Sequence, residues 1–228
     1  MSKIPVFIIN RDRVSSTRRL VEWLLEANTE RIVIMDNKST YPPLLDWYEW
    51  LPDEVEIVDL KENIGWRCVY EHERGKKSVK EPYYVMTDSD VVPADCCPKD
   101  LLDVLADRLE AYCTRAKCGP GLRIDNLPNS YPRKADVIRE QGDFWNRPID
   151  ETCFSAALDT TFAMYRTHEE WPGTSEEVSI RMNFPYVFEH VPWYVWPITD
   201  EERYYAERAL PPPISHMAAA WRSMGAME

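Results

Sequence analysis

The stretch Tyr83-Tyr-Val-Met-Thr-Asp88-Ser89-Asp90-Val-Val-Pro93 decides the fold class. Its first five residues, 83–87, form the apolar, β-rich run expected of a strand buried on both faces. Two carboxylates, one residue apart, follow this strand directly. In open α/β sheets, ligands bind outside the carboxyl ends of the strands. The stretch therefore predicts a buried strand that delivers Asp88 and Asp90 to a ligand site.

Upstream of this stretch, apolar runs alternate with helical patterns. Short apolar runs at 5–9 and 32–35, together with the segment 55–60, predict three further strands. After the first, Ser15 or Ser16 begins a helix with Leu20 and Leu24 on one face. Helices are also predicted from Pro42-Pro43, after Gly65 and from Pro98. Strands that alternate with helices in this way predict an α/β fold with a parallel or mostly parallel central sheet.

Polar residues gather where these predicted strands end. Asn10-Arg11, Asp36-Asn37 and Asn63 follow the first three strands, and Asp88-Ser89-Asp90 follows the fourth. Since the carboxyl ends of parallel strands share one edge of a sheet, these residues are expected to converge on one site.

The second half of the chain is less regular. Pro128, Pro132 and Pro148 interrupt a long connection, with a short helix predicted at 134–141. A strand is predicted at 160–166 and a C-terminal helix at 201–210. We expect a single domain over 1–228, with a nucleotide-binding half (1–110), an acceptor-side half (111–210) and a poorly ordered tail (211–228).

The amino-acid composition limits which binding partners are expected. The net charge of −12 at pH 7 makes a nucleic-acid acceptor an unfavourable expectation without excluding it, although Arg74, Lys76, Lys77 and Lys80 form a local basic run. The sequence shows no signal peptide and no apolar stretch of transmembrane length, so a cytoplasmic location is expected.

The Asp88-Ser89-Asp90 pattern suits a divalent cation. Two nearby carboxylates with open coordination positions can hold Mg²⁺ or Mn²⁺ together with phosphate oxygens. Such an ion neutralises a diphosphate leaving group. Alone, the pattern is weak, because turns and helix caps also use aspartates, but the strand before it strengthens the interpretation.

The motifs together resemble the family-two-like glycosyltransferases with the GT-A fold. Asp88 to Pro93 is similar to their D-x-D segment, and residues 5–13 to their first strand and nucleotide-binding turn. Residues 36–40 and Asn63-Ile64-Gly65 are similar to their second-strand acidic motif and their Asn-x-Gly turn. Residues 159–165, and His190-Val-Pro-Trp-Tyr194, resemble a subgroup of small bacterial and viral enzymes.

The resemblance implies a transferase that moves a sugar from a nucleoside diphosphate, with a UDP-sugar favoured, to a hydroxyl acceptor. It implies Mn²⁺ or Mg²⁺ held by Asp88 and Asp90, with His190 as third ligand and His216 as the alternative. The implied nucleotide-sugar site consists of Asn10, Arg11, Arg13, Asp36, Asn37, Asn63, Trp66, Asp88 and Ser89.

The catalytic carboxylate is less clearly marked. An inverting transferase needs a general base for the acceptor hydroxyl. Asp159, at the start of a predicted strand, and Glu177, in the pair Glu176-Glu177, are the candidates. The sequence decides neither between them nor between inversion and retention. The acceptor, the donor sugar and the oligomeric state also stay open.

Other classes fit less well. A dinucleotide-dependent oxidoreductase or a P-loop enzyme needs a glycine-rich turn after the first strand, where this chain has Asn10-Arg-Asp-Arg13. A nucleotidylyltransferase would show a glycine-rich basic loop. Two alternatives stay open: a nucleotide- or carbohydrate-binding module without turnover, and a glycosyltransferase acting on modified nucleic acid.

Overall fold

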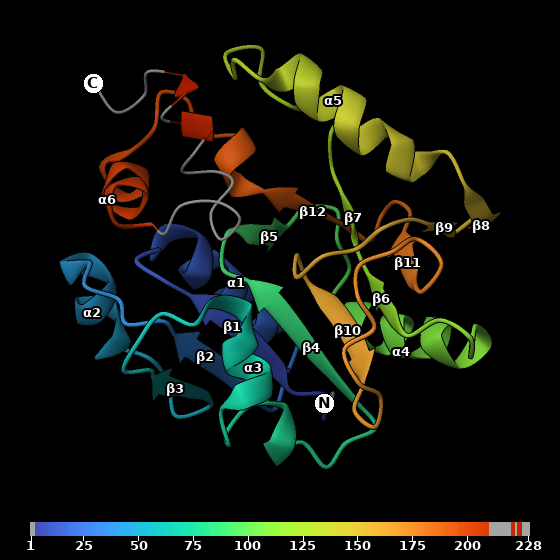
Figure 1. The fold of residues 1–228 in the computed structure, drawn as a ribbon, viewed down its shortest axis with the longest axis horizontal. Coiled ribbons are helices and arrows are strands. Elements are labelled where there is room, and N and C mark those ends of the chain that lie inside the picture. Colours follow the sequence, from blue (N-terminus) through green and yellow to red (C-terminus); the bar gives the residue numbers. More distant parts are fainter. Residues whose placement is uncertain (1–2, 210–219, 222, 225–228) are drawn as a thin grey trace.

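A computed structural model describes residues 3–209, 220–221 and 223–224. Within these residues, the main sheet has nine strands in the order β3-β2-β1-β4-β10-β6-β11-β9-β8 (Figure 1). A small second sheet, in the order β5-β12-β7, lies beside it. The chain thus has the expected α/β architecture.

The first four strands are parallel, as predicted. They are β1 (Val6–Asn10), β2 (Ile32–Asp36), β3 (Val55–Asp59) and β4 (Tyr83–Asp88). β1 pairs in parallel with both β2 and β4, so that Asn10 lies opposite Asp36 and Ile9 lies opposite Asp88. This register brings the polar carboxyl ends of three strands together.

The other half of the main sheet is mixed. β10 (Ala163–Arg166) pairs antiparallel with β4 and with β6 (Lys117–Gly119), whereas β11 (Ser179–Met182) runs parallel to β6. β9 (Cys153–Ser155) and β8 (Pro148–Asp150) complete the edge in antiparallel pairs. The mostly parallel sheet of the prediction therefore applies to the N-terminal half.

The small sheet positions the segment after the paired aspartates. It consists of β5 (Val91–Pro93), β7 (Gly121–Leu122) and β12 (Val187–His190). β12 pairs antiparallel with β5, and His190 lies opposite Val91. His190 is thereby placed next to Asp90, although a hundred residues separate them in the chain.

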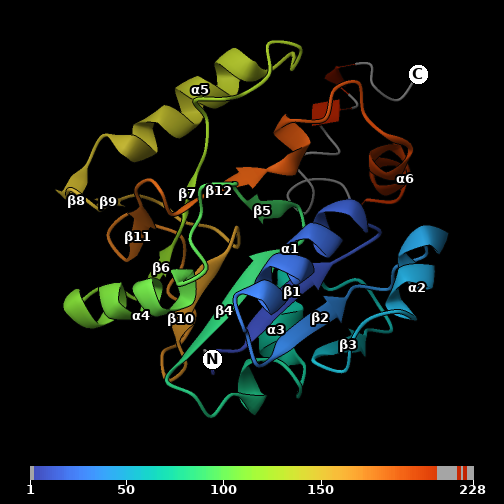
Figure 2. The ribbon, with the colours of Figure 1, turned by 180° about the vertical axis from the view of Figure 1, so that it is seen from behind.

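Helices cover both faces of the main sheet. The α-helices are α1 (Ser15–Glu26), α2 (Pro42–Tyr48), α3 (Cys68–Glu71), α4 (Leu101–Ala111), α5 (Lys134–Gly142) and α6 (Asp200–Arg208). Single 3₁₀ turns occur at η1 (Gly65–Arg67), η2 (Lys76–Ser78), η3 (Asp143–Trp145) and η4 (Val191–Trp193). Figures 1 and 2 show α3 and α1 on opposite sides of β1.

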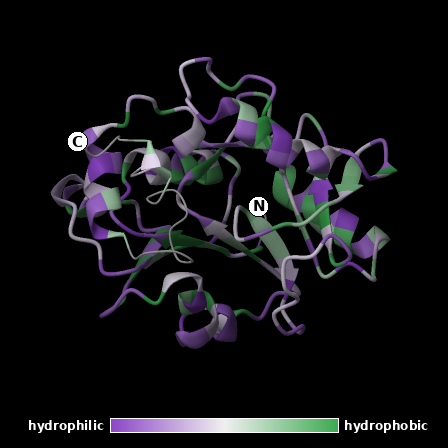
Figure 3. Cartoon of the chain, turned by 45° about the horizontal axis from the view of Figure 1, so that its top comes forward, coloured by the Kyte–Doolittle hydropathy of each residue, from purple (hydrophilic) through white to green (hydrophobic). Residues whose placement is uncertain are grey.

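The strands carry two cores because successive side chains point to opposite faces. On β1, Val6 and Ile8 belong to a core that includes α1 and α4, whereas Phe7 belongs to the core under α3. Figure 3 shows hydrophobic residues concentrated in the central strands and hydrophilic residues on the outer helices and loops.

The C-terminal part of the chain packs on the N-terminal half, where the Glu201 carboxylate of α6 accepts from Ser15 at the start of α1. Trp221 is fully buried and its ring meets Tyr205 of α6 edge-on. Most of the predicted tail, including His216, lies outside the described residues. None of the described helices combines the length and apolar character that a membrane crossing requires.

Candidate functional site

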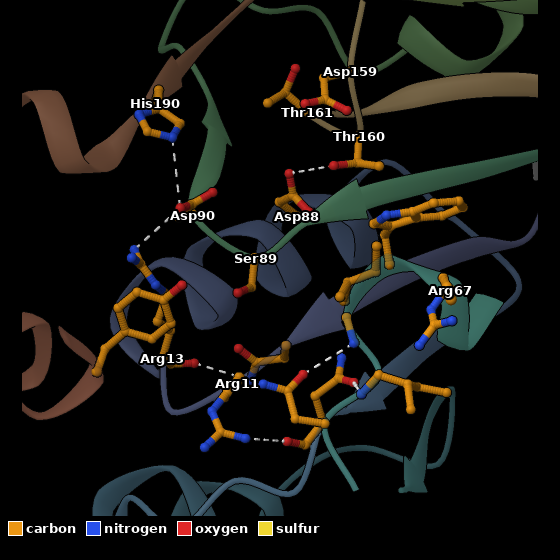
Figure 4. A pocket seen from close by; sticks show the side chains of 18 residues that line it. Arg11, Arg13, Arg67, Asp88, Ser89, Asp90, Asp159, Thr160, Thr161 and His190 are labelled. Carbon is orange, nitrogen blue, oxygen red and sulfur yellow. Dashed lines mark hydrogen bonds and ion pairs between the residues drawn. The ribbon is translucent and has the colours of Figure 1, made fainter. Parts of the chain in front are cut away.

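A cavity of roughly 600 Å³ opens at the carboxyl ends of β1 and β4 (Figure 4). The η1 turn, the loop before β10, the end of β12 and helix α6 complete its wall. The predicted site residues in this wall are Asn10, Arg11, Arg13, Asn37, Asn63, Trp66, Asp88, Ser89, Asp90, Asp159 and His190. Nearly all of the predicted set is therefore gathered around one space.

Asp88 is held in place by the loop before β10. Its backbone N–H donates to the carbonyl of Thr160 (2.9 Å), and the Thr160 hydroxyl donates to Asp88 Oδ2 (2.7 Å). Burial, followed by the negative charge of Asp90, raises the pKa of Asp88 to about 7. Ionised Asp88 thus sits in a place that a cation would stabilise.

Asp90 lies between two nitrogen-bearing side chains. Its Oδ2 is 3.4 Å from Arg13 Nη1 and 3.6 Å from His190 Nε2 (Figure 4). Burial lowers the pKa of His190, while Asp90 opposes this effect, so the neutral imidazole is favoured. His190 Nδ1 is buried without a hydrogen-bond partner among the described residues.

These side chains fit a divalent cation that a diphosphate also coordinates. Within the described part of the chain, no three histidine, cysteine or acidic side chains form a complete metal site by themselves. Mg²⁺-type sites commonly use one or two carboxylates together with substrate phosphates. The pair Asp88 and Asp90 meets that requirement.

The opposite end of the cavity is built from turns. Arg11 Nη1 donates to the carbonyl of Asn37 (2.9 Å), and the Asn37 side chain accepts from the N–H of Ile64 (3.1 Å). Asn63 accepts from the N–H of Gly65, which has a φ of +61°. These bonds fix the two turns relative to each other and leave their polar edges on the cavity.

The side chains of two predicted site residues form hydrogen bonds within the turns around the cavity. Asp36 is 4% exposed, and its carboxylate accepts from the N–H of Ser39 and the hydroxyl of Tyr48 (2.7 Å each). Within the described residues, Asp36 is not part of the cavity wall. Asn10 is fully buried and its side chain bonds Arg13, Thr17 and Tyr48. The side chains of Asp36 and Asn10 therefore shape the turns around the cavity.

The two predicted catalytic carboxylates differ in their position relative to the cavity. Asp159 is exposed and lines the cavity, whereas Glu177 is exposed outside its described wall. The reason is the course of the chain: Glu177 precedes β11, and its carbonyl accepts from Arg115. The structure thus brings Asp159, but not Glu177, to the paired aspartates.

Buried cations support the loop that carries Asp159. The Lys117 amine donates to the carbonyl of Leu158, and Arg181 Nε donates to that of Ala157 (2.7 Å). Burial lowers the pKa of Lys117 to about 8 and that of Arg181 to about 10, with Asp159 opposing both shifts. Hydrogen bonds from Lys117 and Arg181 therefore fix the backbone immediately before Asp159.

Trp66 forms one edge of the cavity. It is 41% exposed, and its ring stacks on that of Trp171 with centroids 4.8 Å apart. One face of the indole is thus held by another ring, which orients it at the cavity rim.

Several cavity residues were not predicted from sequence. They are Ile9, Ile64, Gly65, Arg67, Thr160, Thr161 and Tyr205. Thr160 and Thr161 follow the predicted Asp159 directly, so that segment could have been extended. Tyr205 comes from α6, and no local pattern indicates that this helix returns to the cavity.

No protein-family model matches the chain, and no curated protein matches its sequence. Among solved structures, it is similar to the mannosyltransferase PcManGT from Pyrobaculum calidifontis in complex with GDP-Man and Mn²⁺. That match has a TM-score of 0.52 and 14% identity, and it covers 99% of this chain and 72% of that one.

GalNAc-T7 with UDP, GalNAc and Mn²⁺ matches with a TM-score of 0.54 and 13% identity over 98% of this chain. S. aureus TarS 1-349 in complex with UDP-GlcNAc matches with a TM-score of 0.52 and 15% identity over 90% of this chain. The chain spans 54% and 66% of the lengths of these two structures. At such identities, the similarity shows the fold: the chain has the GT-A fold of these glycosyltransferases.

Proposed function

We propose that the protein is a metal-dependent glycosyltransferase that moves a sugar from a nucleoside diphosphate to a hydroxyl acceptor. The observation that carries the proposal is one cavity that combines Asp88 and Asp90 with His190 and the exposed Asp159. Fold alone does not establish an activity, but this set of side chains supplies the groups that the reaction needs.

Asp88 and Asp90 would hold the metal together with the diphosphate, and His190 is the proposed third ligand. A bound Mn²⁺ or Mg²⁺ supplies the positive charge that stabilises the diphosphate as it leaves the sugar. Thr160 keeps one carboxylate oxygen of Asp88 in a fixed direction through its hydroxyl. The chain's own contribution is therefore to present two carboxylates to an ion and to keep their orientation constant.

The nucleoside would lie against the turns at the ends of β1, β2 and β3. Arg11, Asn37 and Asn63 line that part of the cavity. UDP is the favoured nucleotide because of the sequence resemblance, and solved structures of the same fold contain UDP with Mn²⁺ or GDP-Man with Mn²⁺. GDP is therefore the first alternative to test.

Asp159 is the proposed general base. The acceptor oxygen forms a bond to the anomeric carbon, the bond from that carbon to the diphosphate breaks, and Asp159 takes the hydroxyl proton. The anchored backbone at Ala157 and Leu158 holds the carboxylate toward the cavity. Asp159→Asn should abolish transfer while leaving the binding of the nucleoside diphosphate intact.

A thermal-shift screen tests the donor site. UDP, GDP, TDP and CDP are each added with and without Mn²⁺, because a ligand that binds the native state raises its apparent stability. We expect one nucleotide to raise the Tm only together with the metal, and Asp88→Asn to remove that shift. A folded protein that no nucleotide stabilises under either condition contradicts the proposed function.

A further inference from the structure

We propose that Glu202, on the C-terminal helix α6, sets the metal affinity of the site by neutralising Arg13 next to Asp90. Glu202 is in this sense a positioning residue, since it acts on the metal ligand through Arg13. The inference rests on the proposed function, because it assumes that Asp90 binds the cation.

Arg13 lies between two carboxylates from opposite ends of the chain. Its Nη1 is 3.4 Å from Asp90 Oδ2 and 3.1 Å from Glu202 Oε1. The side chains of Arg13 and Glu202 are 3% and 4% exposed. A guanidinium keeps its proton under all ordinary conditions, so this is a permanent buried positive charge beside a proposed metal ligand.

Aromatic rings hold the guanidinium where it is. Its central carbon lies 4.1 Å from the ring centroid of Tyr205 and 5.7 Å from that of Trp221. Arg13 therefore cannot easily swing away when a cation enters. The site must bind a divalent ion with a fixed positive charge close to one of its two carboxylates.

Glu202 compensates for that charge. Its Oε1 pairs with Arg13, and its Oε2 is buried without a hydrogen-bond partner among the described residues. Among the described residues, Arg13 is the side chain that forms an ion pair with Glu202. Together the two side chains are neutral, which leaves the charge of Asp90 available to a metal ion.

Helix α6 fixes Glu202 independently of the metal. Thr199 caps the helix by accepting from the N–H of Glu202, and Glu201 accepts from the N–H (3.1 Å) and the hydroxyl (2.9 Å) of Ser15 at the start of α1. The carboxylate of Glu202 is therefore held in place by helix packing, which supports a constant electrostatic role.

The test measures Mn²⁺ affinity by electron paramagnetic resonance, with saturating UDP or GDP, whichever gives the larger thermal shift. The titration is run at pH 8, above the pKa of about 7 to which burial raises Glu202 against the opposing charge of Arg13. Glu202→Gln keeps the shape and an acceptor for Arg13 but removes the compensating charge. By Coulomb's law we expect Mn²⁺ affinity to fall on the order of tenfold.

Two further variants separate charge from shape. Glu202→Asp keeps the negative charge at this position, so its Mn²⁺ affinity should stay within about threefold of wild type. Glu207→Gln, on the same helix but 50% exposed at its side chain, should leave Mn²⁺ affinity unchanged.

The outcomes distinguish the two proposals. If the wild-type protein binds no Mn²⁺ with either nucleotide, the proposed function itself fails. If the wild-type protein binds Mn²⁺ and Glu202→Gln binds it equally well, or if Glu202→Asp is as weak as Glu202→Gln, the role of Glu202 is wrong and the proposed function is unaffected.

Discussion

Replacing Lys117 by methionine should change the pH dependence of stability. The Lys117 side chain is fully buried, and its amine lies 5.0 Å from the ring centroid of Trp171 and 5.5 Å from that of Tyr165. Burial lowers its pKa from 10.5 to about 8. Because the unfolded chain binds this proton more tightly than the folded one, Lys117 makes folding more favourable as the pH rises from about 8 to 10.5.

The magnitude follows from the shift in pKa. Each pKa unit corresponds to about 1.4 kcal/mol, so most of a penalty of roughly 3 kcal/mol disappears between pH 7 and pH 10. Lys117→Met removes the buried charge and with it the penalty at pH 7. It also leaves the Leu158 carbonyl without its hydrogen-bond donor, and this loss offsets the gain at pH 7. The variant should therefore be close to wild type at pH 7 and less stable than wild type by roughly 2–3 kcal/mol at pH 10.

Urea denaturation at pH 7, 8, 9 and 10 measures this difference. Lys61→Met is the matched control: its side chain is 89% exposed, so its removal should give a curve parallel to that of wild type. If the stability of Lys117→Met also stays parallel to wild type from pH 7 to pH 10, the account of the buried amine under the Asp159 loop is wrong.

Three shorter predictions concern the cavity. Asp88→Asn should lose the Mn²⁺-dependent nucleotide shift without a lower Tm, as measured by thermal shift, because the buried charge of Asp88 is destabilising. Thr160→Val should reduce Mn²⁺ affinity several-fold in the resonance titration, whereas Thr160→Ser should retain it, since the hydroxyl supplies the side-chain hydrogen bond to the Asp88 carboxylate. Gly65→Ala should destabilise the protein by about 1–2 kcal/mol in urea because of its positive φ, whereas Gly142→Ala, at the end of α5, should not; equal effects would contradict the role given to the turn.

The parallel half of the fold could be predicted because its signals are local. The strands β1, β2 and β4 are short apolar runs that end in polar residues, and the helix starts at Pro42 and near Ser15 follow from the local sequence. Parallel pairing then places the strand ends at one edge, so the convergence of Asn37, Asn63 and Asp88 follows without knowledge of any contact.

The second half could not be predicted in the same way. β6 and β9 have three residues each and β7 has two, which is too short for a periodic pattern. β6 even contains Lys117, a residue type that rarely enters a buried strand. These strands exist because long-range pairing with β10, β11 and β12 satisfies their backbone groups.

The site residues also divide into those that the sequence predicts and those that depend on long-range contacts. His190 was selected by resemblance, and it reaches Asp90 through the pairing of β12 with β5. Glu202 was not foreseen, because 189 positions separate it from Arg13 and its sequence neighbours look like an ordinary exposed helix. Asp36 is predicted to contact the ligand, and its carboxylate also accepts from Tyr48 and Ser39, contacts that sequence alone does not reveal.

Anomalous diffraction from crystals grown with Mn²⁺ and the nucleoside diphosphate selected by thermal shift would locate both the ion and the nucleotide. We expect a manganese peak within coordination distance of the Asp88 or Asp90 carboxylate and of the diphosphate, with the nucleoside against Asn37 and Asn63. A bound nucleotide elsewhere on the protein, or a manganese peak away from both aspartates, would contradict this expectation.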